Sequence, residues 1–92
     1  MQRFKVAHIR EQGEDLIIVF VADQVEFMSA AQKNQILSAL QLCSASAGLQ
    51  GTVVMLWSRG VWCESRLHRL FSSVPYHVLY SNINKELTCN NL

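Results

Sequence analysis

Apolar residues recur along this 92-residue chain in short runs that polar segments separate. Residues 3–10 alternate, with Phe4 and Val6 on one face, and the segment EQGED then supplies turn residues. Residues 16–22, LIIVFVA, are apolar without interruption, which is typical of a central strand covered on both faces. The pattern therefore predicts a β-hairpin whose second strand is central in the sheet.

The middle of the chain predicts a helix and a third strand. Ser29 and Gln32 have the spacing of a capping box, and Gly48 is a natural helix stop. Between them the apolar positions fall three and four residues apart, at Ile36, Leu37, Leu40, Cys43 and Ala47. Residues 51–58, GTVVMLWS, have the β-branched character of a strand, so strand, helix and strand indicate a parallel crossover.

The last third predicts a second helix and a fourth strand. From Cys63 to about residue 73 the apolar positions form one helical stripe, at Cys63, Leu67, Leu70, Phe71 and Val74. Pro75 blocks further helix, and the alternation of residues 76–81, YHVLYS, predicts a strand. Residues 82–89 suit either a helical turn or an edge strand, and residues 90–92 suit a disordered tail.

These elements predict a single α+β domain over residues 1–92, a two-layer sandwich with a mixed four-stranded sheet in the order β-β-α-β-α-β. If both crossovers wind the same way, both helices lie on one side and the other side is bare. The C-terminal segment, another strand order or a second copy of the chain must then cover that side. A symmetric homodimer is the leading expectation, because small domains with surplus apolar surface commonly associate.

Composition and charge limit which classes of partner and which cellular compartment are expected. Half of the residues are apolar and 16% are charged, which favours a folded domain. The net charge of +1, with both signs interleaved, disfavours nucleic acid and anionic membranes. No run approaches the ~20 apolar residues of a membrane helix, and the N-terminus is too polar for a secretory signal. Three cysteines without a CxxC motif predict free thiols in a reducing compartment, and hence a cytoplasmic protein.

Cys63 and Arg69 have the Cys-x5-Arg spacing of cysteine-dependent phosphatases, in which a thiolate attacks phosphorus and the arginine binds the phosphoryl oxygens. The intervening residues, ESRLH, contain no glycine to curl the loop, and Leu70 follows where those enzymes have Ser or Thr. The preferred interpretation makes Cys63 a small core residue. A thiol-dependent enzyme acting on a phosphate ester is the alternative.

Polar and aromatic residues near the predicted strand ends indicate a ligand or partner surface, because ligands collect at the carboxyl ends of parallel strands. Arg59 is expected to meet an anion, beside a stacking wall of tryptophan. The residues of this surface are Asp23, Trp57, Ser58, Arg59, Trp62, Arg66, Arg69 and Asn82. No catalytic, metal-binding or cofactor-binding motif accompanies them. The leading hypothesis is a non-catalytic homodimeric interaction or regulatory module, which binds a protein partner or a small anionic ligand.

Overall fold

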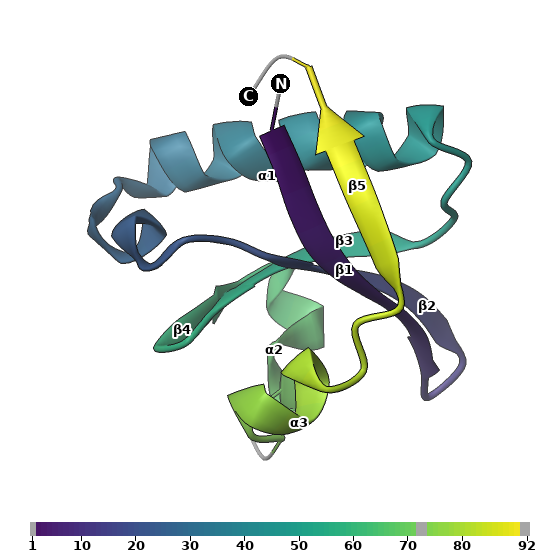
Figure 1. Cartoon of the computed structure of the whole chain (residues 1–92). Helices are drawn as coiled ribbons and strands as arrows, with labels where there is room; N and C mark the ends of the chain where they lie inside the picture. Colours follow the sequence, from purple (N-terminus) through teal and green to yellow (C-terminus); the bar gives the residue numbers. More distant parts are fainter. Residues whose placement is uncertain (1, 72–73, 91–92) are drawn as a thin grey trace.

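The chain folds around a five-stranded mixed sheet, which the computed structural model describes for residues 2–71 and 74–90. The strands lie in the order β4-β3-β2-β1-β5 (Figure 1). β1 (Gln2–Glu11) and β2 (Glu14–Phe20) pair antiparallel, and β3 (Thr52–Trp57) pairs parallel with β2. The predicted hairpin, parallel crossover and mixed sheet are therefore confirmed.

The crossover helix α1 (Ala30–Ser46) begins at the predicted capping box. The backbone N–H of Gln32 donates to the Ser29 hydroxyl at 3.1 Å, and the Ser29 N–H donates to the Gln32 side chain at 3.0 Å. Beyond the helix, Gly48 has a φ of 82°, the left-handed conformation common where a helix ends. Both predicted ends of this helix are thus confirmed.

One side chain joins α1 to the start of β3. Gln41 donates from Nε2 to the carbonyl of Gly51 at 2.9 Å and accepts at Oε1 from the N–H of Val53 at 3.0 Å. Gly51 has a φ of 135°, and a Cβ there would lie 2.6 Å from the Asp15 carbonyl oxygen. The approach to β3 therefore needs glycine at this position.

Strand β2 divides the interior into two cores, because successive side chains of a strand point to opposite faces. Ile17 and Val19 pack on the side of α1 together with Leu40. Ile18 and Phe20 pack on the other side. All five side chains are buried. The uninterrupted apolar run therefore belongs to a central strand with both faces covered, as predicted.

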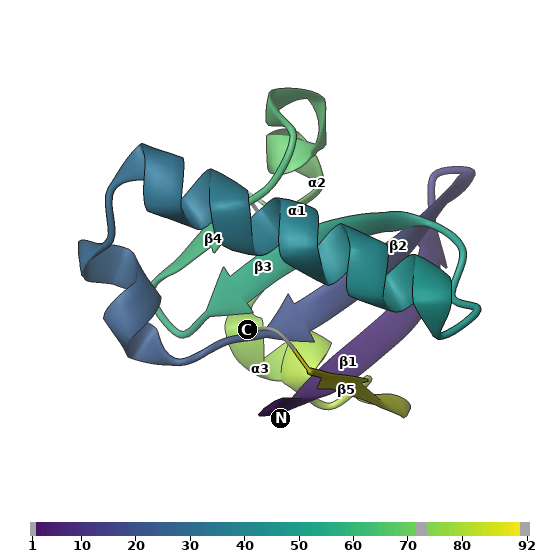
Figure 2. The ribbon, with the colours of Figure 1, turned by 90° about the horizontal axis from the view of Figure 1, so that it is seen from above.

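Helices cover both faces of the sheet. α1 lies on one face, and η2 (Ser65–Leu67), α2 (His68–Phe71) and α3 (Tyr76–Tyr80) lie on the other (Figure 1, Figure 2). Buried Leu67 and Leu79 belong to the core of this second face. The predicted two-layer sandwich is thus wrong, and η2, α2 and α3 of the same chain supply the cover that the second face was expected to need. The bare sheet face that supported a dimer does not exist.

The predicted strand over residues 76–81 is also wrong, because this segment forms α3. Tyr76, Leu79 and Tyr80 have the three- and four-residue spacing of a helical face. Leu79 is buried, and both tyrosine rings meet Phe20 edge-on, with ring centroids 5.7 and 5.3 Å away. Packing against β2 therefore stabilises the helical alternative.

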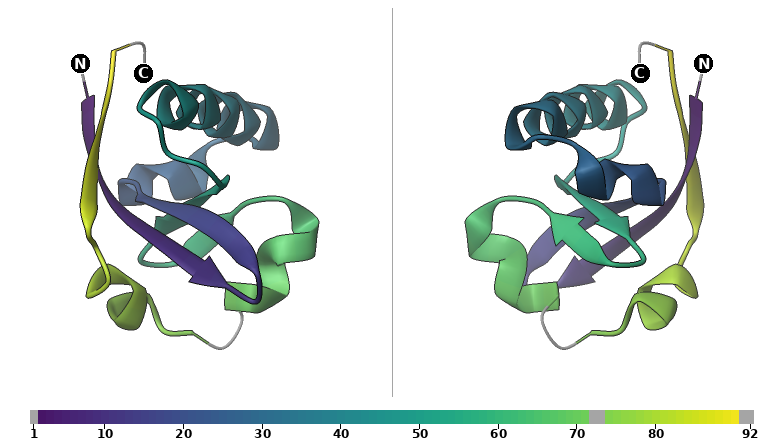
Figure 3. Two further views of the ribbon diagram at one scale, coloured as in Figure 1. Left: turned by 90° about the vertical axis from the view of Figure 1, so that its right-hand side faces the viewer. Right: turned by 90° about the vertical axis from the view of Figure 1, so that its left-hand side faces the viewer.

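Two short strands complete the sheet. β4 (Gly60–Trp62) turns back antiparallel to β3, so the second parallel crossover does not form and the sheet has five strands instead of four. β5 (Lys85–Cys89) pairs antiparallel with β1, which selects the edge strand over the helical turn. Figure 3 shows the first and last strands side by side. Of the predicted tail, Asn90 forms a bend and residues 91–92 lie outside the described part.

The second helical stretch is shorter than its apolar stripe predicted. Cys63 precedes η2, the helix of α2 ends at Phe71, and residues 72–73 lie outside the described part of the chain. Cys63 and Leu67 are nevertheless buried, and Leu70 packs against the same core. The periodicity thus predicted these buried positions but not the length of the helix.

Candidate functional site

The carboxyl ends of β2 and β3 carry polar groups that bind each other. η1 (Asp23–Phe27) follows β2, and Ser58 and Arg59 form the turn after β3. The Asp23 carboxylate accepts hydrogen bonds from the Ser58 hydroxyl at 2.9 Å and from the Ser58 N–H at 3.3 Å. The structure therefore brings these two predicted site residues together, and they tie η1 to the β3–β4 turn.

One charged and one apolar side chain project into solvent beside this tie. Arg59 Nη1 lies 3.9 Å from Glu26 Oε2, and the Arg59 side chain is 74% exposed. Phe27 follows in η1 and is 84% exposed, while Val25 of the same turn is buried. An aromatic ring held in water on an anchored turn is the kind of residue that a partner buries.

The two tryptophans lie beneath Lys33. Its Nζ is 4.8 Å from the Trp62 ring centroid and 5.5 Å from that of Trp57, within the range of cation–π attraction. Trp62 also donates from Nε1 to Asn34 Oδ1 at 2.9 Å. Trp57 is buried and covers Gly60 so closely that a Cβ there would lie 2.8 Å from the ring. Trp57 is therefore a core residue. The Trp57 and Trp62 rings were expected to stack on a ligand, but Lys33 lies over both of them.

We define the strand-end surface by seven residues from η1, the start of α1, the β3–β4 turn and β4: Asp23, Glu26, Phe27, Lys33, Ser58, Arg59 and Trp62. It holds two carboxylates and two cations around one exposed aromatic ring. Sequence reasoning missed Glu26, Phe27 and Lys33. The signal for Glu26 and Phe27 was the connection DQVEFM, which places a single large aromatic residue in a polar segment between strand and helix.

The remaining predicted site residues lie outside the strand-end surface. Arg66 donates to Glu14 and Glu64, each at 2.8 Å, and the hydrogen bond to Glu14 is the main reason that the pKa of Arg66 is raised. Arg66 and Arg69 line the same shallow hollow. Asn82 donates from Nδ2 to the carbonyl of Val78, so it completes the end of α3. Arg66 is therefore paired with carboxylates of its own chain.

The environment of Cys63 opposes a catalytic thiolate. Burial, with a smaller contribution from the charge of Glu64, raises the pKa of Cys63 to about 11. A nucleophilic cysteine needs the opposite shift, which positive charge or a helix N-terminus provides. The side chain instead belongs to the core beneath α2 and α3. The preferred interpretation of Cys63 as a core residue agrees with this placement.

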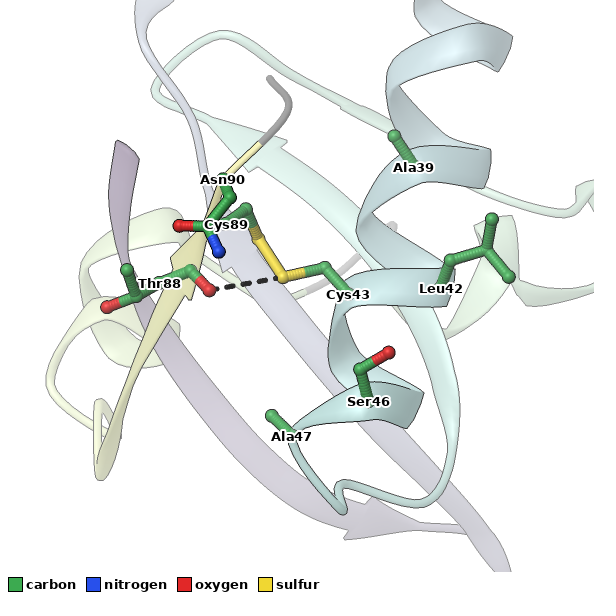
Figure 4. Close-up of a pocket in the computed structure, with 8 residues that line it drawn as sticks. All are labelled: Ala39, Leu42, Cys43, Ser46, Ala47, Thr88, Cys89 and Asn90. Atoms are coloured by element: carbon green, nitrogen blue, oxygen red, sulfur yellow. Dashed lines mark hydrogen bonds between the residues drawn. A yellow bond between two sulfur atoms is a disulfide. The ribbon is translucent and has the colours of Figure 1, made fainter. Parts of the chain in front are cut away.

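Cys43 and Cys89 form a disulfide between α1 and β5, with their Cα atoms 5.9 Å apart. The prediction of free thiols is thus wrong for this pair and holds only for Cys63. Figure 4 shows the disulfide among the residues of a hollow of about 430 Å³, between the C-terminal half of α1 and the end of β5. Cys43 Sγ also lies 3.3 Å from the Thr88 carbonyl oxygen.

Within residues 2–71 and 74–90, no three His, Cys, Asp or Glu side chains gather as a metal would require. No helix of these ranges is long and apolar enough to cross a membrane. No protein-family model matches the sequence, and comparison with curated proteins and with solved structures finds no significant similarity.

Proposed function

We propose that this protein is a non-catalytic interaction module that forms a symmetric homodimer through the strand-end surface. The observation that carries the proposal is the 84% exposure of Phe27 beside the loosely paired Glu26 and Arg59. Phenylalanine and arginine are both enriched in protein–protein interfaces relative to the rest of the protein surface. The strand-end surface replaces the sheet face as the expected site of association.

A second copy of the chain fits this surface because its charges are self-complementary. In a twofold dimer, residue i of one copy meets residue j of the other, and j meets i in return. The Arg59 side chain is 74% exposed and its contact with Glu26 of the same copy is long, at 3.9 Å, so its guanidinium can turn toward Glu26 of the second copy. Rotation about an axis near Phe27 would then bring two such pairs around two aromatic rings.

Sedimentation velocity over a wide range of protein concentrations tests the proposal. The wild-type protein should approach the mass of two chains, and Phe27→Asp should weaken association by at least about 30-fold, the effect of losing about 2 kcal/mol. Leu42→Asp is the matched control, because Leu42 is also an exposed apolar residue, at 72%, but lies on α1 beside the disulfide. This control variant should associate like the wild type.

Charge reversal supplies a sharper test. Arg59→Glu and Glu26→Arg should each weaken the dimer by like-charge repulsion, and the double variant should restore it. A wild-type protein that remains monomeric at every concentration would refute the dimer. Native mass spectrometry that finds monomers retaining a small anion would direct attention to Arg59 as a ligand contact instead.

A cytoplasmic location stays a prediction, since the disulfide removes the free-thiol argument for it.

A further inference from the structure

The disulfide hollow lies away from the strand-end surface and presents its two sulfur atoms unequally. Cys89 is 2% exposed and belongs to the core under α1. Cys43 is only half-buried, on the side of α1 that faces β5. A thiolate that enters the hollow therefore reaches the sulfur of Cys43 before that of Cys89. Access to the sulfur atom is one of the factors that decide thiol–disulfide exchange.

We propose that this hollow is a site of S-thiolation, in which a peptide thiol of the glutathione class forms a mixed disulfide with Cys43. The incoming thiolate attacks Cys43 Sγ and forms a new S–S bond, while the Cys43–Cys89 bond breaks. Cys89 leaves with the electron pair and takes a proton from solvent. A second molecule of the thiol can then release Cys43, and the peptide thiol is oxidised to its own disulfide.

The lining of the hollow suits a short peptide better than a simple thiol. Its volume of about 430 Å³ is within the range of small-molecule sites, about 300–1,000 Å³. Ser46 and Asn90 supply a hydroxyl and an amide group for peptide hydrogen bonds, Thr88 supplies its carbonyl oxygen, and Leu42 forms an apolar wall. The C-terminal turn of α1 lies at the same place. Its partial negative charge favours the ammonium group of a γ-glutamyl residue.

Burial of Cys89 restricts the exchange to Cys43. Cys89 is 2% exposed, so a second thiol from solvent does not reach its sulfur after the bond breaks. After the bond breaks, the end of β5 is no longer linked covalently to α1.

Two experiments with the full chain test this site. The oxidised wild-type protein is incubated briefly with glutathione, then quenched with N-ethylmaleimide and mapped by mass spectrometry. The expected product carries glutathione on Cys43 and maleimide on Cys89. The reaction should also be several-fold faster than with β-mercaptoethanol. Glutathione found on Cys89, or equal rates with the two thiols, would overturn the proposal.

The second experiment accumulates the adduct and does not depend on a short-lived intermediate. With oxidised glutathione, Cys89→Ser should gain one glutathione at Cys43 several-fold faster than Cys43→Ser gains one at Cys89. Adding Ser46→Trp to Cys89→Ser should slow the reaction several-fold by filling the hollow. Ser38→Trp, at an exposed position of α1 outside the hollow, should not. Equal modification of the two single-cysteine variants, or no effect of Ser46→Trp, would refute the site.

Discussion

Removal of the disulfide should cost this chain a large share of its stability. The bond between Cys43 and Cys89 closes a loop with a sequence separation of 46. A cross-link of this span lowers the entropy of the unfolded chain by an amount worth about 4 kcal/mol at 25 °C. Because small domains have only about 5–15 kcal/mol to lose, Cys43→Ser/Cys89→Ser should fold but be marginally stable. β5 keeps its pairing with β1 and the buried Leu87 in this variant.

Urea unfolding followed by tryptophan fluorescence measures the loss. With a slope of about 1–3 kcal/mol per molar urea, the midpoint should fall by roughly 1–4 M. Wild-type protein in dithiothreitol should unfold at the midpoint of the double variant, and the reductant should leave the double variant unchanged. A loss below about 1 kcal/mol would refute the chain-entropy reasoning, because the bond would then not restrict the unfolded state.

Three further predictions concern two side chains, Gln41 and Cys63, that the proposals do not use. Gln41→Leu should lower the free energy of unfolding by about 1–3 kcal/mol in the same urea assay, because the Gly51 carbonyl and the Val53 N–H lose their partner. The control variant is Gln35→Leu, at an exposed position of α1. Iodoacetamide should alkylate Cys63 at pH 7 roughly 100-fold more slowly in the native protein than in urea, because burial raises its pKa from 9.0 to about 11. The free energy of unfolding should include a contribution from protonated Cys63 that is complete below pH 9 and lost as the pH rises through 11. Cys63→Ala should remove this pH dependence. Alkylation as fast in the native as in the unfolded protein would contradict the raised pKa of Cys63.

The sequence predicted those elements whose pattern has one structural solution. The run of residues 16–22 is too apolar for any place except a central strand, and the capping box of Ser29 marks one helix start. Residues 76–80, YHVLY, fit both the two-residue period of a strand and the helical period. Their side chains alternate as in a strand, but Tyr76, Leu79 and Tyr80 also share one helical face. Only contact with the core of the second sheet face selects the helix.

The sequence predicted which residues lie together at the strand ends only where they directly follow a strand. Asp23 and Ser58 come after β2 and β3, so the strand-end rule placed them together. Phe27 and Lys33 lie farther along η1 and α1, and their place depends on how those elements turn back over the sheet. The Cys43–Cys89 bond depends on β5 pairing with β1, and no pattern in either segment shows that pairing.

The position of β5 also determines when the chain can finish folding during its synthesis. Gln2 lies opposite Cys89 in the sheet, so the first strand waits for a partner from almost the other end of the chain. At about 5–20 residues per second, the ribosome leaves that edge of β1 unpaired for several seconds. An unpaired edge strand readily pairs with other unfolded chains. Nascent chains that stop before β5 are therefore the form that a chaperone is expected to bind.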